Sequence, residues 1–371
     1  MIYRCPRCGS TSSSDWRCPH CGSLMEIRLE RIFWEVQEGE PSIWRYKNLL
    51  PRAKRIVSLG EGLTDVRRVN GTLIKDETKN PTGSYIDRGS SVLVSCSDMA
   101  NRVELEFSPD VTISLASYIL RCGGSIEVRV DPERVDWDEL LYLSQLDAAI
   151  SFGPHGFRSD YENPFMLEGF KTIAYEIYEF REGIGGIAIP SESGVLAYGV
   201  LKGFLELEEM GLMRVPQVYL AHHGPLRGEL VDILLAMGVR PVEADPRETV
   251  DSMIRLARMG IYVKPVSAMA YAVASRLGGD VIALLTGTGL RRWRGAHPRL
   301  TDLQRRVLAV MRRGREMTAY QIWRQIDEAS LQGVYKALFK LSGMGLISSK
   351  RRMCGRRIKR VYYLTGGEPD G

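Results

Sequence analysis

Four cysteines near the N-terminus have the types and spacing for metal chemistry. They form the pairs Cys5-Pro-Arg-Cys8 and Cys18-Pro-His-Cys21, and a glycine follows each pair. Two Cys-x-x-Cys pairs separated by nine residues have the spacing of a tetrahedral zinc site made of four thiolates, with no coordination position left for a substrate. We therefore predict a structural zinc ion bound by Cys5, Cys8, Cys18 and Cys21. A redox dithiol is the alternative, but two matched pairs outside any strand–helix pattern favour the metal.

A polar turn, Asn80-Pro-Thr-Gly-Ser84, precedes a helical pattern and is the second candidate site. Backbone amides at a helix N-terminus, together with the helix dipole, favour bound anions. The alternative is that a serine or threonine of the turn simply caps the helix.

Positive charge is concentrated at the C-terminal end of the chain. Residues 299–364 hold 16 Lys and Arg against four acids, a net charge of +12, whereas residues 1–298 sum to −5. The total of +5 hides this asymmetry, which is typical of a basic module that binds nucleic acid.

The elements that position these residues belong to more than one domain, because 371 residues exceed the size of one ordinary core. Between residues 44 and 291, apolar runs such as 125–130, 186–189 and 281–285 alternate with amphipathic helical patterns. This alternation predicts an α/β fold with a largely parallel sheet, whose ligands bind at the carboxyl ends of the strands.

No apolar run is long enough to cross a membrane and no signal-peptide pattern is present, so we expect a cytoplasmic protein. Arg outnumbers Lys 39 to 11, and Asn and Gln together number only 12, which suggests a thermophilic source.

The basic module resembles a winged-helix domain. Thr301-Asp-Leu-Gln304 and Thr318-Ala-Tyr-Gln321 are capping boxes that open two helices, a third helix begins at Ser330, and two strand-like runs, 348–352 and 357–364, follow. In such a domain the third helix enters the major groove and the hairpin, or wing, contacts phosphates. We predict double-stranded DNA as the partner, with RNA, a protein-docking surface or a merely solvated basic face as alternatives. The predicted contacts are Gln332, Tyr335, Lys336 and Lys340 on the helix, and Lys350, Arg351, Arg352, Arg356, Arg357, Lys359 and Arg360 on the wing.

Most of residues 1–291 resembles threonine synthase, a pyridoxal-phosphate (PLP) enzyme of fold type II. The likeness is carried by several segments in the family's order, and archaeal-type members also have N-terminal Cys-x-x-Cys pairs. It implies a body of two doubly wound parallel-sheet subdomains and often a symmetric dimer. The matching segments are 44–51, 58–62, 75–88, 163–164, 168–177, 202–207, 265–268 and 285–290.

The residues that would perform the family's chemistry are changed. The position of the family's Schiff-base lysine is Ile86, and isoleucine can neither form an imine nor carry a proton. The segment whose asparagine contacts the cofactor ring reads Ser108-Pro-Asp-Val111, and the glycine-rich phosphate loop reads Ser191-Glu-Ser-Gly-Val195, with Glu192 where a phosphate would lie. The resemblance therefore implies a pseudoenzyme without PLP. Five residues would line a remaining pocket for a small anion, an amino acid or a phosphorylated amino acid: Asn80, Thr82, Ser84, Arg88 and Thr286.

Together these observations predict three parts. They are a zinc knuckle over residues 1–25, a threonine synthase-like α/β domain over residues 26–298 and a winged helix-turn-helix over residues 299–371. The predicted function is DNA binding, as a transcription regulator, with the body serving as a dimerisation scaffold or as a ligand sensor. A residual PLP-dependent threonine synthase or lyase is the first alternative, and an architectural or assembly protein on nucleic acid is the second.

Overall fold

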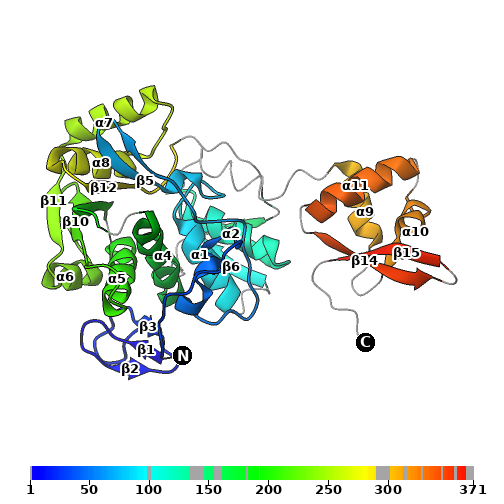
Figure 1. The fold of residues 1–371 in the computed structure, drawn as a ribbon, viewed down its shortest axis with the longest axis horizontal. Helices are drawn as coiled ribbons and strands as arrows, with labels where there is room; N and C mark the ends of the chain where they lie inside the picture. The colour runs from blue at the N-terminus through cyan, green and yellow to red at the C-terminus, as the bar shows by residue number, and fades with distance from the viewer. Residues whose placement is uncertain are drawn as a thin grey trace. The chain divides into compact units, whose positions relative to one another are not determined.

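A computed structural model describes most of the chain as two compact units, residues 1–296 and 297–371 (Figure 1). The division falls two residues before the predicted boundary at residue 298. None of the helices described is long and apolar enough to span a membrane. The described residues are 2–97, 102–133, 146, 148–153, 161–180, 183–191, 193–289, 301–311, 316–326, 329–343, 346–354 and 357–364.

The N-terminal cysteines lie in a three-stranded antiparallel ribbon. Strand β1 (Ile2–Arg4) pairs with β2 (Thr11–Ser12) on one side and with β3 (Glu26–Arg28) on the other. The ribbon therefore extends past the predicted limit at residue 25, because β3 completes its sheet. Its buried side chains, including Leu24 and Ile27, belong to the same apolar core as the body, so the ribbon packs as part of the first unit.

A six-stranded sheet forms the centre of the first unit, and all its pairs are parallel except β4 with β5. Three of its inner strands, β9, β12 and β5, are buried along their whole length, as expected for parallel strands covered by helices. Ile187 and Ile189 belong to the core on one face, whereas Ala188 between them belongs to the core on the other. In spatial order the strands are β11 (Arg240–Glu243), β10 (Gln217–His222), β9 (Gly186–Pro190), β12 (Val281–Leu285), β5 (Thr72–Asp76) and β4 (Val66–Val69).

Helices cover both faces of this sheet. The larger core also contains residues of α1 (Ile86–Cys96), α4 (Pro164–Phe180), α5 (Val195–Glu209) and α6 (Glu229–Ala236), and α7 (Pro246–Arg258) and α8 (Pro265–Leu277) cover the other face. Helix α4 packs very closely between α1 and α5. A Cβ atom at Gly169 would lie 2.3 Å from the carbonyl oxygen of Arg88, and one at Gly203 would lie 2.3 Å from that of Lys171. Both glycines belong to segments that carry the family resemblance, so those segments maintain helix contacts.

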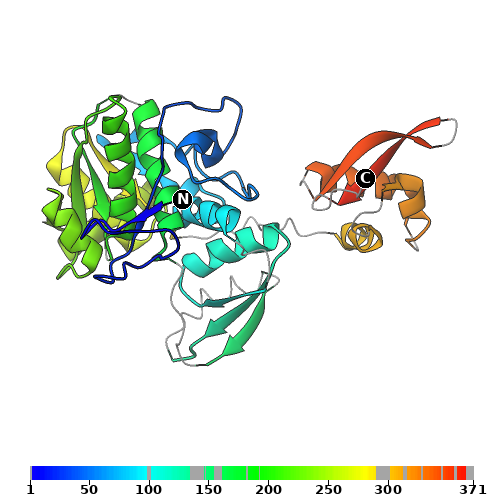
Figure 2. The same cartoon turned by 90° about the horizontal axis from the view of Figure 1, so that it is seen from below.

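A second, smaller parallel sheet projects from the unit beside helix α2 (Val111–Arg121), as Figure 2 shows. It contains β6 (Arg102–Glu106), β7 (Ser125–Val130) and β8 (Ala149–Phe152), in that order. Two parallel-sheet regions in one body confirm the predicted α/β fold class.

In its described residues, the second unit has three helices and a three-stranded antiparallel sheet of order β13-β15-β14. Its elements are α9 (Asp302–Val310), β13 (Met317–Thr318), α10 (Ala319–Trp323), α11 (Leu331–Gly343), β14 (Ile347–Cys354) and β15 (Arg357–Leu364). Both predicted capping boxes are present, at Thr301 with Gln304 and at Thr318 with Gln321. A separate core, which includes Val307, Ile322, Val334 and Leu338, holds the unit together.

Candidate functional sites

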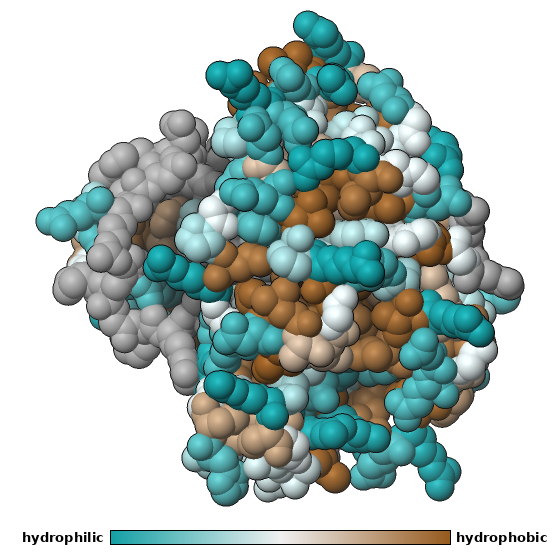
Figure 3. Space-filling view, turned by 90° about the vertical axis from the view of Figure 1, so that its left-hand side faces the viewer, coloured by the Kyte–Doolittle hydropathy of each residue, from teal (hydrophilic) through white to brown (hydrophobic). Residues whose placement is uncertain are grey.

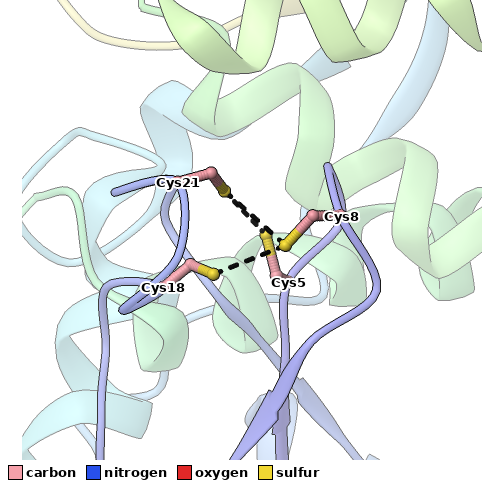
Figure 4. Close-up of side chains that lie close together, drawn as sticks. All are labelled: Cys5, Cys8, Cys18 and Cys21. Atoms are coloured by element: carbon pink, nitrogen blue, oxygen red, sulfur yellow. Dashed lines mark hydrogen bonds between the residues drawn. The ribbon is translucent and has the colours of Figure 1, made fainter.

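The four N-terminal cysteines converge on one point (Figure 4). All four Sγ atoms lie within 4.8 Å of one another, with 3.5 Å between Cys5 and Cys21 and between Cys8 and Cys18. A zinc ion with Zn–S bonds of about 2.3 Å places its sulfurs about 3.8 Å apart in a regular tetrahedron. The cluster therefore has the dimensions to hold one zinc ion, as its spacing predicted.

The two halves of the cluster are built alike. Gly9 N–H donates to the Cys5 carbonyl and Gly22 N–H to the Cys18 carbonyl, at 3.0 and 2.8 Å, and both glycines have positive φ. The ribbon is also tied to the body, because the Leu24 amide donates to Glu229 at 2.8 Å. Loss of order in the ribbon would thus expose part of the main core.

A cavity of about 390 Å³ lies in the body at the carboxyl ends of β9 and β12. The first residues of α1, α2 and α5 line it, together with Lys264, the N-cap residue of α8, and with Val266 and Met269 of α8. This is the position at which parallel α/β sheets bind ligands. The described residues that line it are Tyr85, Ile86, Ser108, Pro109, Asp110, Val111, Tyr161, Pro190, Ser191, Ser193, Gly194, Val195, Leu196, Lys264, Val266, Met269 and Thr286.

The cavity brings together the segments in which the sequence departs from the family. Ile86 is buried in the cavity wall, together with Asp110 and Val111 from the altered ring-contact segment and Gly194 from the altered phosphate loop. Gly194 has φ +83°, and a Cβ atom there would lie 3.0 Å from the Val231 nitrogen, which explains why this glycine remains. Glu192, whose carboxylate we placed near the phosphate position, lies outside the described residues.

Asp110 and Lys264 form an ion pair in the cavity wall that the sequence did not suggest. The Lys264 Nζ and Asp110 Oδ2 atoms lie 3.0 Å apart. Asp110 has φ +62° and ψ −49°, and the Val111 N–H donates to the Pro109 carbonyl across it, so the residue is the centre of a γ-turn. This conformation is costly for a non-glycine residue, and strained residues cluster at ligand sites.

Of the five predicted pocket residues, only Thr286 lines the cavity. Asn80 accepts from the Gly62 amide and donates to Glu77, Thr82 bonds to Asp87, and Ser84 accepts from the Ile86 amide. Thr82 N–H and its hydroxyl both donate to Asp87, whose pKa is raised to about 7 by burial. The turn therefore uses its polar groups to stabilise its own fold.

Arg88, the predicted anion-binding arginine, is fully buried in a network of four charged side chains. Its Nε donates to Glu77 at 2.6 Å, Nη1 to Glu176 at 2.6 Å, and Nη2 to Glu77 and Glu176 at 2.9 and 2.8 Å. Lys75 completes the network with a 2.5 Å contact to Glu176. The guanidinium has no donor left for a ligand, so this prediction is corrected: Arg88 holds the fold.

The hairpin of the second unit places like charges directly opposite each other. In the register of β14 and β15, Arg351 faces Arg360 and Arg352 faces Lys359. Cross-strand like charges destabilise a sheet. Lys350 and Arg352 share the acid Glu316, at 2.6 and 2.8 Å, and these two cations lower the pKa of Glu316. Arg356 lies outside the described residues, as does the side chain of Arg357.

The third helix exposes the four residues predicted for it, Gln332, Tyr335, Lys336 and Lys340. It also exposes Phe339, which the sequence analysis missed although its spacing of four from Tyr335 places it on the same face. Phe339 is 82% exposed, the highest value among the large apolar side chains described.

Comparison with known proteins supports the resemblance of the body. The chain is 30% identical over 257 residues to threonine synthase of Methanocaldococcus jannaschii, covering 57% of this chain and 63% of that protein. It is 25% identical over 249 residues to threonine synthase of Methanosarcina acetivorans, covering 57% and 58%. The body is threonine synthase-like. The chain spans about 60% of the length of these two relatives, and no sequence profile of a known protein family matches it.

Solved structures show the same fold for the threonine synthase-like body. A pyridoxal 5'-phosphate-dependent aspartate racemase aligns with a TM-score of 0.51 at 16% identity, over 62% of this chain and 92% of that one. Maize serine racemase aligns at 0.52 and 14%, over 61% and 88%, and O-ureido-L-serine synthase at 0.51 and 16%, over 68% and 97%. These likenesses establish a PLP fold-type II architecture.

Two residues of the cavity wall differ in chemistry from those that the resemblance assigns to PLP binding. Ile86 presents a hydrocarbon side chain where the resemblance requires an amine, and Val111 stands where an asparagine would contact the ring. Lys264 is the one side-chain amine among the described residues that line the cavity, and it is the N-cap residue of α8, whereas Ile86 begins α1.

Proposed function

We propose that this chain is a cytoplasmic DNA-binding protein, a transcription regulator, whose threonine synthase-like body is catalytically inactive. The second unit has the element order of a winged helix: helix, strand, two helices and a two-stranded hairpin. Its third helix carries the residues that would enter the major groove, and its hairpin carries the residues that would contact phosphates.

The observation that carries this proposal is the placement of like charges on the hairpin. Arg351 opposite Arg360 and Arg352 opposite Lys359 weaken the free sheet, and a polyanion would relieve that repulsion. On the exposed face of α11, Lys336 and Lys340 add two further cations. The repulsion would make the hairpin less stable alone than when it is bound to phosphates. This favours nucleic acid as a partner over the alternative of a basic face that contacts only water.

We expect the affinity for duplex DNA to fall steeply with salt, and the two arginines at the centre of β14 to contribute unequally. Arg351 lies on the strand face away from Glu316, so Arg351→Ala should reduce the slope of log affinity against log salt by about 0.9. Arg352→Ala should reduce it by less, because Glu316 already neutralises part of its charge. Titration of DNA by fluorescence anisotropy across salt concentrations measures both slopes. An affinity that does not depend on salt, or equal effects of the two variants, would count against this interface.

The control is Glu316→Gln, which leaves Lys350 and Arg352 without their acid. It should tighten DNA binding and steepen the slope of log affinity against log salt.

Selection of bound DNA from a random library separates a regulator from an architectural protein, since an architectural protein would enrich no sequence.

We further propose that the cavity of the body binds a small anionic effector, an amino acid or a phosphorylated amino acid. The hydroxyl of Ser191 is buried in the cavity wall and has no hydrogen-bond partner among the described residues. Val195 and Leu196 begin α5, where backbone N–H groups have no acceptor within the helix. These backbone donors favour an anion. Lys264 would contact it by exchanging its 3.0 Å ion pair with Asp110 for the ligand.

We expect an effector to raise the melting temperature of the protein and to change its DNA affinity. A ligand at one hundred times its Kd stabilises the folded state by about 2.7 kcal/mol. Differential scanning fluorimetry with a panel of amino acids and their phosphorylated forms tests this, and Lys264→Ala should abolish any shift. If no compound on the panel shifts the melting temperature, the body is a scaffold.

The same proposal includes a homodimer, which would present two third helices to two half-sites. Seen from the side of α6 and α7, the first unit carries apolar patches between charged side chains (Figure 3). Leu235 and Met237 at the end of α6, and Val250 and Ile254 on α7, are exposed. A palindromic selected DNA site would support the dimer.

The enzyme alternative is favoured by one observation, the presence of Lys264 in the cavity. We expect no visible absorbance band when PLP is added to the purified protein, because Ile86 cannot form an imine and Lys264 is engaged by Asp110. A borohydride-reducible band that disappears in Lys264→Ala would contradict the pseudoenzyme proposal and identify Lys264 as the reacting amine.

A further inference from the structure

The exposed face of α11 combines aromatic and cationic side chains in a regular pattern. Gln332, Tyr335, Lys336, Phe339 and Lys340 follow one another at spacings of three, one, three and one, which places them on one face of a helix. The opposite face, with Val334, Leu338 and Leu341, is buried in the core of the unit.

Phe339 contributes little to the stability of the unit, since its side chain is 82% exposed. It lies beside a shallow groove of about 520 Å³, whose wall between α9 and α11 includes Leu303, Tyr335 and Ala337. An exposed phenylalanine at the edge of an apolar groove indicates a contact with another molecule.

The charges around Phe339 restrict what that molecule is. Lys336 and Lys340 flank it on the helix, and neither forms an ion pair in the part of the chain that the structure describes. A partner that combines negative charge with a small apolar projection would complement both features. The major groove of DNA does so at every thymine, whose C5-methyl group projects between the two phosphate backbones.

We infer that Phe339 reads a thymine methyl group and so determines sequence specificity. The inference rests on the proposed DNA-binding function and assigns Phe339 a base contact, whereas Lys336 and Lys340 approach phosphates or base edges. A second copy of the chain, or another protein, is the competing occupant of the groove.

Deoxyuridine tests the inference because it differs from thymidine only by the missing methyl group. The full chain is first used to select its DNA site, and each thymine of that site is then replaced by deoxyuridine. At the contacted position, we expect wild-type affinity to fall about fourfold, the equivalent of one buried methyl group at ~0.8 kcal/mol. Phe339→Ala should bind the thymine-containing site more weakly than wild type does. Its affinity should not fall further when deoxyuridine replaces the contacted thymine.

Three controls make the result specific. Arg351→Ala, a phosphate-contact variant, should bind more weakly but keep the fourfold methyl effect. Phe33→Ala, which removes an exposed phenylalanine of the first unit, should behave as wild type. Phe339→Leu should restore part of the methyl effect, since leucine keeps an apolar contact.

Two outcomes would overturn the inference while leaving DNA binding intact: an equal methyl effect in wild type and Phe339→Ala, or no methyl effect at any thymine. A change of oligomeric state in Phe339→Ala, measured by light scattering, would also overturn it by assigning the groove to a second copy. If no DNA is selected at all, the proposed function itself fails.

Discussion

Replacing Glu176 by Gln should destabilise the first unit by about 3–5 kcal/mol, the cost of removing one partner from a buried ion pair. Glu176 is buried and joins four segments: it contacts Lys75 on β5, Arg88 on α1, and the amides of Leu63 and Thr64 at 2.8 and 3.2 Å. Glutamine has nearly the same shape but leaves the two cations with only Glu77 for compensation. Urea denaturation followed by tryptophan fluorescence measures the loss, because five of the six tryptophans lie in residues 1–296.

The matched control is Glu248→Gln, which breaks the exposed pair of Glu248 with Arg276, and it should cost less than about 1 kcal/mol. If the two variants lose equal stability, the network contributes no more than a surface pair.

The pH dependence of the free energy of unfolding gives an independent check on the role of Glu176. Burial alone would raise the pKa of Glu176, but Arg88 and Lys75 lower it below its usual value of 4.5. A carboxylate with a lowered pKa contributes stability above its unfolded pKa, and that contribution is lost as the pH falls through the folded pKa. The difference in free energy of unfolding between wild type and Glu176→Gln should therefore be constant near neutral pH. It should shrink below about pH 4.5.

Loss of the predicted zinc ion is the second change that should greatly reduce stability, here the stability of the N-terminal ribbon. We expect the purified protein to hold one zinc per chain, and Cys18→Ser to lose both the metal and the order of residues 2–28. Structural zinc supplies about 10–16 kcal/mol of apparent folding free energy in zinc-finger peptides. The ribbon has only three short strands besides the cluster, so without metal its remaining support is its contact with the body.

Elemental analysis and hydrogen exchange together test this prediction. Loss of amide protection should centre on residues 2–28 and leave α11 unchanged, since α11 belongs to the other compact unit. Cys122→Ser is the control, because Cys122 is outside the cluster and should leave the zinc content unchanged. A full zinc content in Cys18→Ser would contradict the four-thiolate site.

The segments that resemble threonine synthase prove to be the ones that hold the fold. Lys75 and Arg88 lie in one of these segments, Glu176 in another, and together with Glu77 they form a single buried network. Glu168, Lys171, Lys202 and Glu206 form a second network in which the two lysines contact the two glutamates. The cavity is lined both by matching segments, through Ile86, Val266 and Thr286, and by the altered segments 108–111 and 191–195.

The sequence by itself determined the features that depend on local spacing. The four cysteines, the two capping boxes, the alternation of strands and helices and the basic C-terminal module are all periodic or short-range patterns. Such patterns follow from the geometry of knuckles, helices and strands, so Cys5 to Cys21 and the caps at Thr301 and Thr318 could be predicted residue by residue.

Only the tertiary structure decided which polar groups are available to a partner. Arg88 follows a turn that resembles an anion-binding site, but Glu77, eleven residues earlier, and Glu176, from a distant segment, accept its hydrogen bonds. Asp110 and Lys264, 154 positions apart, meet in the cavity wall. Glu316 pairs with both Lys350 and Arg352 of the wing, so its single negative charge offsets part of theirs. A charged side chain is stabilised by whichever opposite charge the fold brings within a few ångströms, and in a parallel sheet those neighbours come from distant parts of the chain.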